Sequence, residues 1–273
     1  MKKILFAIPF LLFHVLTYAQ TESHGPVSTA MGGVYTTTND FWSSVNNQAG
    51  LAFIDNPTLG IGYNNEFLLK ELATKYVGFA MPLKGAGTFG LQVSQFGFNL
   101  LNQTKIGLGY GMKFSESFSG GIQLDYFHLQ LGDIYGSTGA FTFEVGAMYK
   151  MSEKWVLGAH LFNPVMAKLA DYNDERMTTV LGAGVSFLAS EQVQFAAEVE
   201  KSIENKASVK LGIDYSIMDF LNIRIGAASN PTQLAFGFGL DFNNFQLNFA
   251  GSYHQVLGVS PSTGIVYRFN RAE

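Results

Sequence analysis

The 273-residue chain contains no cysteine, which excludes disulfide bonds, thiolate metal sites and the lipid-modified cysteine of a lipoprotein. Beyond its first residues it also lacks the ~18 consecutive apolar residues that a membrane-spanning helix needs. Charged residues are sparse, at 14% of the chain, and the net charge is −4. Without a basic excess, the protein is not expected to bind nucleic acid.

The N-terminus has the composition of a secretory signal peptide. Lys2 and Lys3 precede an apolar run from Ile4 to Val15, and the small residues Thr17 and Ala19 fit a cleavage site before Gln20. We therefore predict that residues 1–19 are a signal peptide and that the chain is exported.

From about Thr58 onward, apolar and polar residues alternate in stretches of about ten residues. Val209 and Ile213, for example, share one face of an extended strand, whereas Lys210 and Asp214 share the other. A water-soluble β-sandwich also alternates, but the export signal, 25 phenylalanines and 30 glycines favour strands with one face in lipid and one in a lumen. The sequence predicts an all-β fold, a transmembrane antiparallel β-barrel spanning residues 57–273.

The alternating stretches predict about fourteen strands. We place them at residues 58–63, 72–81, 87–97, 105–114, 118–130, 138–150, 154–162, 178–188, 192–202, 207–216, 221–229, 233–241, 245–254 and 263–269. Connections of one parity are short (115–117, 152–153, 189–191, 218–219, 243–244) and those of the other are longer (131–137, 163–177, 255–262). This separation predicts an outer-membrane barrel of a Gram-negative bacterium, in contact with lipid and with both termini in the periplasm.

The last predicted strand has a polar residue followed by Gly264 and by aromatics at alternate positions, Tyr267 and Phe269. This pattern resembles the β-signal that the barrel-assembly machinery recognises on its client proteins. An ordinary terminal strand with two aromatics is the alternative.

Residues 20–56 do not alternate, and here the chain resembles the FadL superfamily, more closely its PorV/PorQ-like branch found in Bacteroidota. Members open with a small-residue, Met-Gly-Gly-aromatic stretch and a short segment ending in Asn-Pro-Ala-Gly-Leu. The matching residues are Met31, Gly32, Gly33, Tyr35, Asn47, Ala49, Gly50 and Leu51, with Gln48 in place of the proline. The resemblance implies a fourteen-stranded barrel whose lumen holds this N-terminal segment as a plug or hatch.

Asp40 is suited to cap a short helix over residues 41–47, with Phe41 and Trp42 near one side of it and Gly50 available to end it. The segment is either a movable gate or a fixed cork that fills a lumen too wide for side chains alone. We favour the cork.

Charged residues of both signs fall on the predicted lumen face. Mixed signs favour an internal ion-pair network over an ion-selective pore. The predicted set is Lys105, Lys113, Asp125, Glu144, Glu198, Glu200, Lys210, Asp214, Arg224, Asp241 and Arg268.

No motif for catalysis, a metal or a cofactor is evident, and the protein is not expected to be an enzyme. His128 or His160 could serve a barrel-mounted phospholipase, but a histidine at the interface or in the lumen is the favoured interpretation. Glycine-rich runs at residues 107–111 and 237–239 lack the strand-turn-helix context of a phosphate site. We expect small lumen positions there, where the plug or the opposite wall comes close.

Two function classes remain. The PorV/PorQ-like resemblance implies an accessory subunit of a larger outer-membrane complex in the type IX secretion context, with a large barrel or associated lipoproteins as partners. The wider FadL resemblance implies a transporter of hydrophobic small molecules. We favour the accessory subunit, because the longest connection, 163–177, is charge-rich and offers little apolar material to capture such a molecule.

Overall fold

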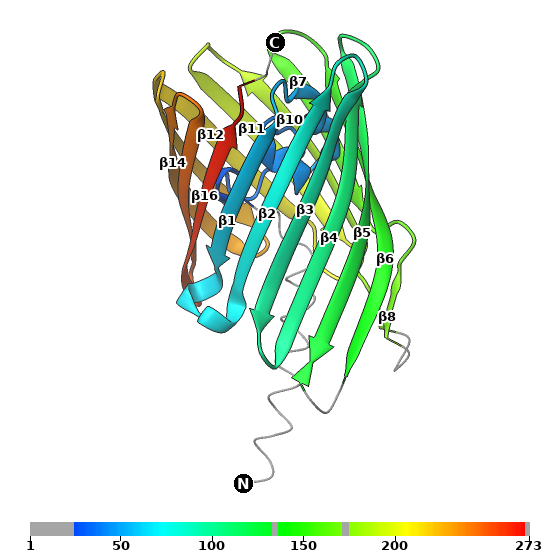
Figure 1. Ribbon diagram of the computed structural model, residues 1–273. Coiled ribbons are helices and arrows are strands. Elements are labelled where there is room, and N and C mark those ends of the chain that lie inside the picture. The colour runs from blue at the N-terminus through cyan, green and yellow to red at the C-terminus, as the bar shows by residue number, and fades with distance from the viewer. Residues whose placement is uncertain (1–24, 133–135, 171–174, 271–273) are drawn as a thin grey trace.

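The computed structural model describes residues 25–132, 136–170 and 175–270. The predicted signal peptide, residues 1–19, lies outside these ranges. Fourteen antiparallel strands close into a barrel, in which each strand pairs with its neighbours in sequence and β16 returns to β1, with Gly62 opposite Gly264 (Figure 1). The predicted fold class is confirmed.

The barrel strands have the following bounds: β1 (Thr58–Asn65), β2 (Ala73–Leu83), β3 (Gly87–Phe98), β4 (Leu101–Lys113), β5 (Phe118–Leu131), β6 (Ser137–Lys150), β7 (Trp155–Phe162), β10 (Val180–Leu188), β11 (Val193–Ser202), β12 (Ser208–Met218), β13 (Leu221–Ser229), β14 (Thr232–Phe242), β15 (Phe245–His254) and β16 (Gly258–Arg268). Two short strands, β8 (Lys168–Ala170) and β9 (Glu175–Arg176), pair with each other outside the barrel sheet. Two single-turn helices, η3 (Glu66–Leu68) and η4 (Lys70–Leu72), connect β1 to β2.

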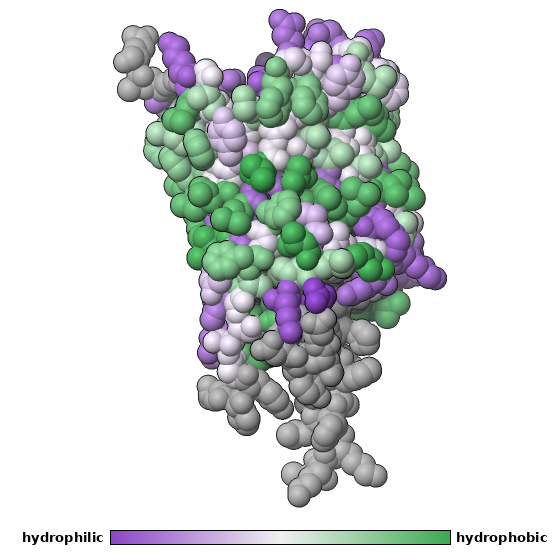
Figure 2. Space-filling view, turned by 90° about the vertical axis from the view of Figure 1, so that its right-hand side faces the viewer, coloured by the Kyte–Doolittle hydropathy of each residue, from purple (hydrophilic) through white to green (hydrophobic). Residues whose placement is uncertain are grey.

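Alternation along each strand separates an apolar outer face from a polar inner face. On β12, Leu211 is 53% exposed on the outside, whereas its neighbour Lys210 is 7% exposed. Figure 2 shows the outer side chains as a largely hydrophobic band between hydrophilic ends. So much exposed apolar surface is stable only against lipid, which supports the outer membrane as the location. None of the helices in the described ranges is long or apolar enough to span a membrane.

The two ends of the barrel differ in their connections. At one end, which we call the turn end, each connection between strands has at most four residues, for example 84–86 and 114–117. The opposite end, the loop end, carries the longest connection, residues 163–179. The turn end also holds the start of β1 and the end of β16 (Figure 1). That the turn end faces the periplasm remains a prediction.

The predicted separation of connection lengths is only partly right, because residues 99–100, 230–231 and 255–257 at the loop end are also short. The expected connection 255–262 was wrong because β16 begins at Gly258 and includes Pro261. Proline donates no ladder hydrogen bond and is largely confined to edge strands, to the first residue of a strand or to bulges. Here β16 runs past its last pair with β1, Ser262 with Asn64, so this part of β16 has no β1 neighbour.

The N-terminal segment, residues 25–56, lies inside the barrel in the half nearer the turn end, and we call it the plug (Figure 1). It contains helices α2 (Pro26–Ala30), η1 (Phe41–Ser44) and η2 (Gln48–Phe53). As predicted, the Asp40 carboxylate caps η1, accepting a 2.9 Å hydrogen bond from the Trp42 backbone N–H.

The predicted helix over residues 41–47 was wrong in its extent. It ends at Ser44, and Gly50 lies inside η2 rather than ending a helix. The cause is Asn47, whose side chain accepts from the backbone N–H of Ala49 at 3.1 Å and so starts a second helix.

Glycines form a ring around the lumen wall where the plug touches it. Twelve of the fourteen barrel strands place a glycine against the plug, such that an added Cβ would contact a plug residue. This glycine belt comprises Gly60, Gly78, Gly90, Gly111, Gly121, Gly146, Gly158, Gly182, Gly212, Gly226, Gly237 and Gly264. The expected role of the runs 107–111 and 237–239 is confirmed at Gly111 and Gly237.

The belt brings plug backbone against wall backbone. A Cβ on Gly226 would overlap the backbone of Met31 and Gly32, and a Cβ on Gly32 would lie 2.5 Å from the Ala227 nitrogen. Gly32 and Gly33 also adopt positive φ angles of 70° and 86°, which favour glycine. Trp42, which is fully buried, packs edge-on against Tyr76 and contacts Gly264. The plug is therefore fitted to the wall by shape as well as by polar contacts.

We expect Gly226→Ala to destabilise the docked plug by ~1–3 kcal/mol, because an overpacked site must shift rigid backbone. The measurement is the chemical unfolding midpoint of the detergent-solubilised barrel, followed by Trp42 fluorescence with Trp155 replaced by phenylalanine. Gly251→Ala is the matched control, since its Cβ would meet its nearest neighbour at 3.6 Å. Equal midpoints for the two variants would contradict the close fit.

Candidate functional site

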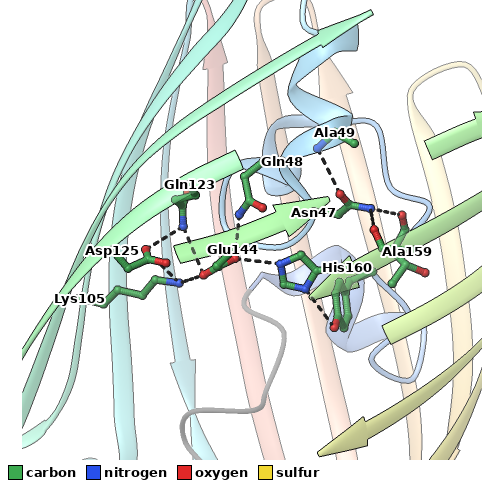
Figure 3. A network of polar contacts seen from close by, with 11 residues as sticks. Asn47, Gln48, Ala49, Lys105, Gln123, Asp125, Glu144, Ala159 and His160 are labelled. Carbon is green, nitrogen blue, oxygen red and sulfur yellow. Dashed lines mark hydrogen bonds and ion pairs between the residues drawn. The ribbon is translucent and has the colours of Figure 1, made fainter. Parts of the chain in front are cut away.

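A buried polar cluster joins the plug to four neighbouring strands (Figure 3). Glu144 on β6 is its centre: His160 Nε2 on β7 and Gln48 Nε2 of the plug each lie 2.9 Å from Glu144 Oε2. Lys105 on β4 pairs with Glu144 and, at 3.4 Å, with Asp125 on β5. Gln48, which stands where the resembling family has proline, thus ties the plug to the wall.

A second cluster anchors the plug farther around the wall, at β11 and β12. Glu198 on β11 accepts hydrogen bonds from the backbone N–H groups of Tyr35 and Thr36, both at 2.9 Å, and from the Thr36 hydroxyl at 2.8 Å. Lys210 on β12 donates to the Gly33 carbonyl at 3.1 Å and pairs with Glu200 at 2.9 Å. One wall carboxylate therefore satisfies three plug donors at once, which makes Glu198 the main polar anchor of the plug.

Two further ion pairs line the lumen. Arg224 Nε lies 2.8 Å from Asp214 Oδ2, and Arg268 lies 3.4 Å from Asp241. The structure places Lys113 outside these pairs: it is the exposed last residue of β4, and its ammonium lies 4.6 Å from the centre of the Phe53 ring. The other ten lumen charges predicted from sequence take part in ion pairs within the described residues.

Sequence reasoning missed the neutral members of the clusters. Gln48 was noted only as a missing proline, and Gln123, which donates to Asp125 at 2.9 Å, was not considered. His160, for which a position at the interface or in the lumen was the favoured interpretation, is a buried lumen residue held by Glu144 and 3.4 Å from the Tyr35 hydroxyl. Alternation along β7 could have placed His160 in the lumen, because Leu157 and Leu161 take the outer positions.

Burial raises the pKa of two plug residues. It raises the pKa of the Asp40 carboxyl to about 6, against the lowering effects of Arg224 and of the hydrogen bond from Trp42. Burial also raises the pKa of the Tyr35 hydroxyl well above its usual value, reinforced by Glu200 and Glu198. Tyr35 therefore remains neutral beside these carboxylates.

Between the first polar cluster and the loop end, the lumen becomes apolar. Side chains from β3 to β7 and from β10 meet there with two from the connection 163–179. We call this set the inner apolar cluster: Phe96, Leu101, Phe127, Leu129, Ala140, Phe162, Leu169, Met177 and Val180, all buried. The expectation that the connection offers little apolar material was wrong, because Leu169 and Met177 fold inward over the lumen.

Asn163 holds the connection in this inward position. Its fully buried side chain donates to the carbonyls of Met177 at 2.7 Å and Thr178 at 3.2 Å. It also accepts from the Ala167 backbone at 2.9 Å and from the Thr142 hydroxyl of β6 at 2.7 Å. The four hydrogen bonds of the Asn163 side chain thus help to hold the charge-rich connection over the cluster.

The other side of the lumen at the loop end is polar. A cavity of about 390 Å³ lies beside the plug between the loop-end halves of β11 to β15, and residues such as Glu200, Lys206 and Asn230 line it. The loop end therefore presents two environments, one apolar and one polar.

A scan against models of known families and a search of curated proteins find no match. Solved structures do match. The toluene transporter TodX of P. putida aligns over 92% of this chain and 100% of its own, with a TM-score of 0.72 and 13% identity. The toluene transporter TbuX of Ralstonia pickettii aligns over 91% of this chain and 99% of its own, with a TM-score of 0.69 and 15% identity. A Pseudomonas aeruginosa FadL homologue aligns over 92% of this chain and 98% of its own, with a TM-score of 0.59 and 14% identity. The chain thus shares the fold of FadL-type outer-membrane barrels. Two of the three structures named here are toluene transporters.

Glu198→Ala should loosen the plug at a cost of ~3 kcal/mol or more, because two backbone N–H groups and a hydroxyl lose their acceptor and Lys210 loses an ion-pair partner at 3.5 Å. In planar bilayers we expect the unaltered protein to be closed and Glu198→Ala to open transiently at least fivefold more often. Glu204→Ala, an exposed carboxylate at the loop end, serves as the control. Steady open channels from the unaltered protein would refute a closed lumen.

Asp40→Asn should change the pH dependence of stability. The raised folded pKa means that stability is highest where Asp40 is protonated and is lost as pH rises through about 6. Asparagine also caps helices but stays neutral. The gain in unfolding midpoint of Asp40→Asn over the unaltered protein should therefore be near zero at pH 4 and grow up to pH 7; a pH-independent difference would contradict the burial of this carboxylate.

Proposed function

We propose that this barrel admits small hydrophobic molecules through the outer membrane. The observation that carries the proposal is the inner apolar cluster, which places phenylalanines inside the lumen near the loop end. A channel for hydrophilic solutes gains nothing from such a surface, since apolar area facing water costs ~25 cal/mol per Å². A hydrophobic solute gains that amount on entering.

The closed state is consistent with a capture site. Leu169 and Met177 cover the cluster and occupy the position that an apolar cargo would take. Cargo can therefore replace protein side chains without exposing the cluster to water. The described residues of the connection 163–179 are held by the hydrogen bonds of Asn163 and by the Thr138 hydroxyl, which donates to the Leu169 carbonyl at 2.6 Å. Opening breaks these contacts and leaves the ladder of the barrel sheet intact.

The likeness to toluene transporters supports this proposal only at the level of the fold, because identity is 13–15%. An accessory role in a larger complex, with PorV/PorQ-like ancestry and a type IX secretion context, stays a prediction. The outer apolar band is what a lipid-facing wall needs, and it does not distinguish lipid from a protein partner. Purification in mild detergent followed by mass spectrometry separates the two: a stoichiometric large barrel supports the accessory role, and bound apolar molecules support transport.

We expect the barrel, displayed on a Gram-negative host, to speed entry of the neutral hydrocarbon fluorophore 1,6-diphenylhexatriene at least threefold over cells without it. Leu129→Asn, which places an amide in the inner apolar cluster, should remove most of this gain. Leu100→Asn should not, because Leu100 is 63% exposed outside the cluster, whereas Leu129 is 4% exposed within it. Equal entry with and without the barrel would overturn the proposed function.

A further inference from the structure

We propose that the polar cluster around Glu144, which adjoins the inner apolar cluster on its turn-end side, recognises an ammonium group. The preferred cargo is then an apolar amine, and an apolar carboxylate is excluded. This inference rests on the proposed function and names its substrate class.

The fixed charges beside the inner apolar cluster favour a cation. Lys105 is 12% exposed at its side chain and already pairs with two carboxylates, Asp125 and Glu144. Its charge is therefore not available to an anionic head group. An incoming carboxylate would be a third anion around a single lysine in a site of low dielectric, where like-charge contacts are costly.

The two carboxylates, Glu144 and Asp125, differ in how many hydrogen bonds they accept. Glu144 is served by Lys105, His160 and Gln48. Asp125 is fully buried, and its Oδ2 has no hydrogen-bond partner in the described part of the chain, although Oδ1 accepts from Gln123. A buried carboxylate oxygen without a donor is costly, and an ammonium group brings three donors and no acceptor.

A second unpartnered polar side chain, an amide with both a donor and an acceptor, lies in the same cross-strand row. Gln92 on β3 pairs with Gly107 on β4, which pairs in turn with Asp125 on β5. Gln92 is 2% exposed, and neither its oxygen nor its nitrogen has a partner among the described residues. The side chains of Asp125 and Gln123 lie over Gly107, 2.8 Å from where a Cβ would stand. The side chains of Asp125 and Gln123 thus fill the space that a side chain at position 107 would need.

Two phenylalanine rings lie next to this row. The Lys105 ammonium lies 5.5 Å from the centre of the Phe127 ring and 5.4 Å from that of Phe162. These rings already lie beside one ammonium, and a ligand cation within about 6 Å of a ring centre is attracted to it in the same way. The alkyl part of an amine would then occupy the inner apolar cluster in place of Leu169 and Met177.

The test compares three ligands that share a twelve-carbon chain: dodecylamine, dodecanol and dodecanoate. Each is radiolabelled, and its retention by the detergent-solubilised, immobilised barrel is measured at pH 7. We expect the amine to bind at least tenfold more tightly than the carboxylate, with the alcohol between them. Asp125→Asn should weaken amine binding at least tenfold and reduce the discrimination against dodecanoate.

Asp219→Asn is the matched control, because it makes the same charge change at an exposed turn-end position and should leave binding unchanged. Gln92→Leu is a second variant, expected to weaken amine binding severalfold while leaving dodecanol unaffected. The comparison of ligands on the unaltered protein needs no variant, so it stands even where Asp125→Asn does not fold.

Equal binding of the three ligands, or tightest binding of dodecanoate, would overturn the ammonium site while leaving hydrophobic uptake in place. Retention of none of them would overturn both proposals. Loss of amine binding in Asp219→Asn equal to that in Asp125→Asn would also overturn the site, because the effect would then come from net charge alone.

Discussion

The structure depends on the contact between the plug and the glycine belt. A fourteen-stranded barrel has a lumen too wide for wall side chains to fill, and its interior would otherwise be an open aqueous channel. Glycines on twelve strands remove the wall side chains at the level of the plug, so that plug backbone or plug side chains pack directly against the wall backbone around most of the circumference. Glu198 then adds three hydrogen bonds to the plug from one carboxylate.

This arrangement orders the lumen along its axis. The glycine belt and plug occupy the half near the turn end, and the clusters around Glu144 and Glu198 connect them to the wall. Toward the loop end, one side of the lumen is apolar and covered by the connection 163–179, and the other is a polar cavity. A molecule entering from the loop end would thus meet an apolar surface first and a charged layer next. That sequence suits an amphipathic cargo better than a hydrophilic one.

Alternation made most of the barrel predictable from sequence, because a strand between lipid and lumen has little freedom in where it places Leu211 or Lys210. The plug was harder. Asp40 was recognised as a cap, but Asn47 also caps, and its effect on Gly50 could not be foreseen from spacing alone. Gln48 and Glu144 are 96 residues apart, so their contact depends on how the plug is threaded through the closed barrel. The inward fold of Leu169 and Met177 was likewise hidden behind the charged composition of their connection.

The central claim is that the plug is a fixed part of the wall rather than a freely moving gate. Hydrogen exchange at the backbone N–H groups of Tyr35 and Thr36 tests it most directly, since both donate to Glu198 in the middle of the lumen. The account predicts that these two amides exchange as slowly as the ladder amides of β11. Exchange within seconds, while the β11 amides stay protected, would contradict it.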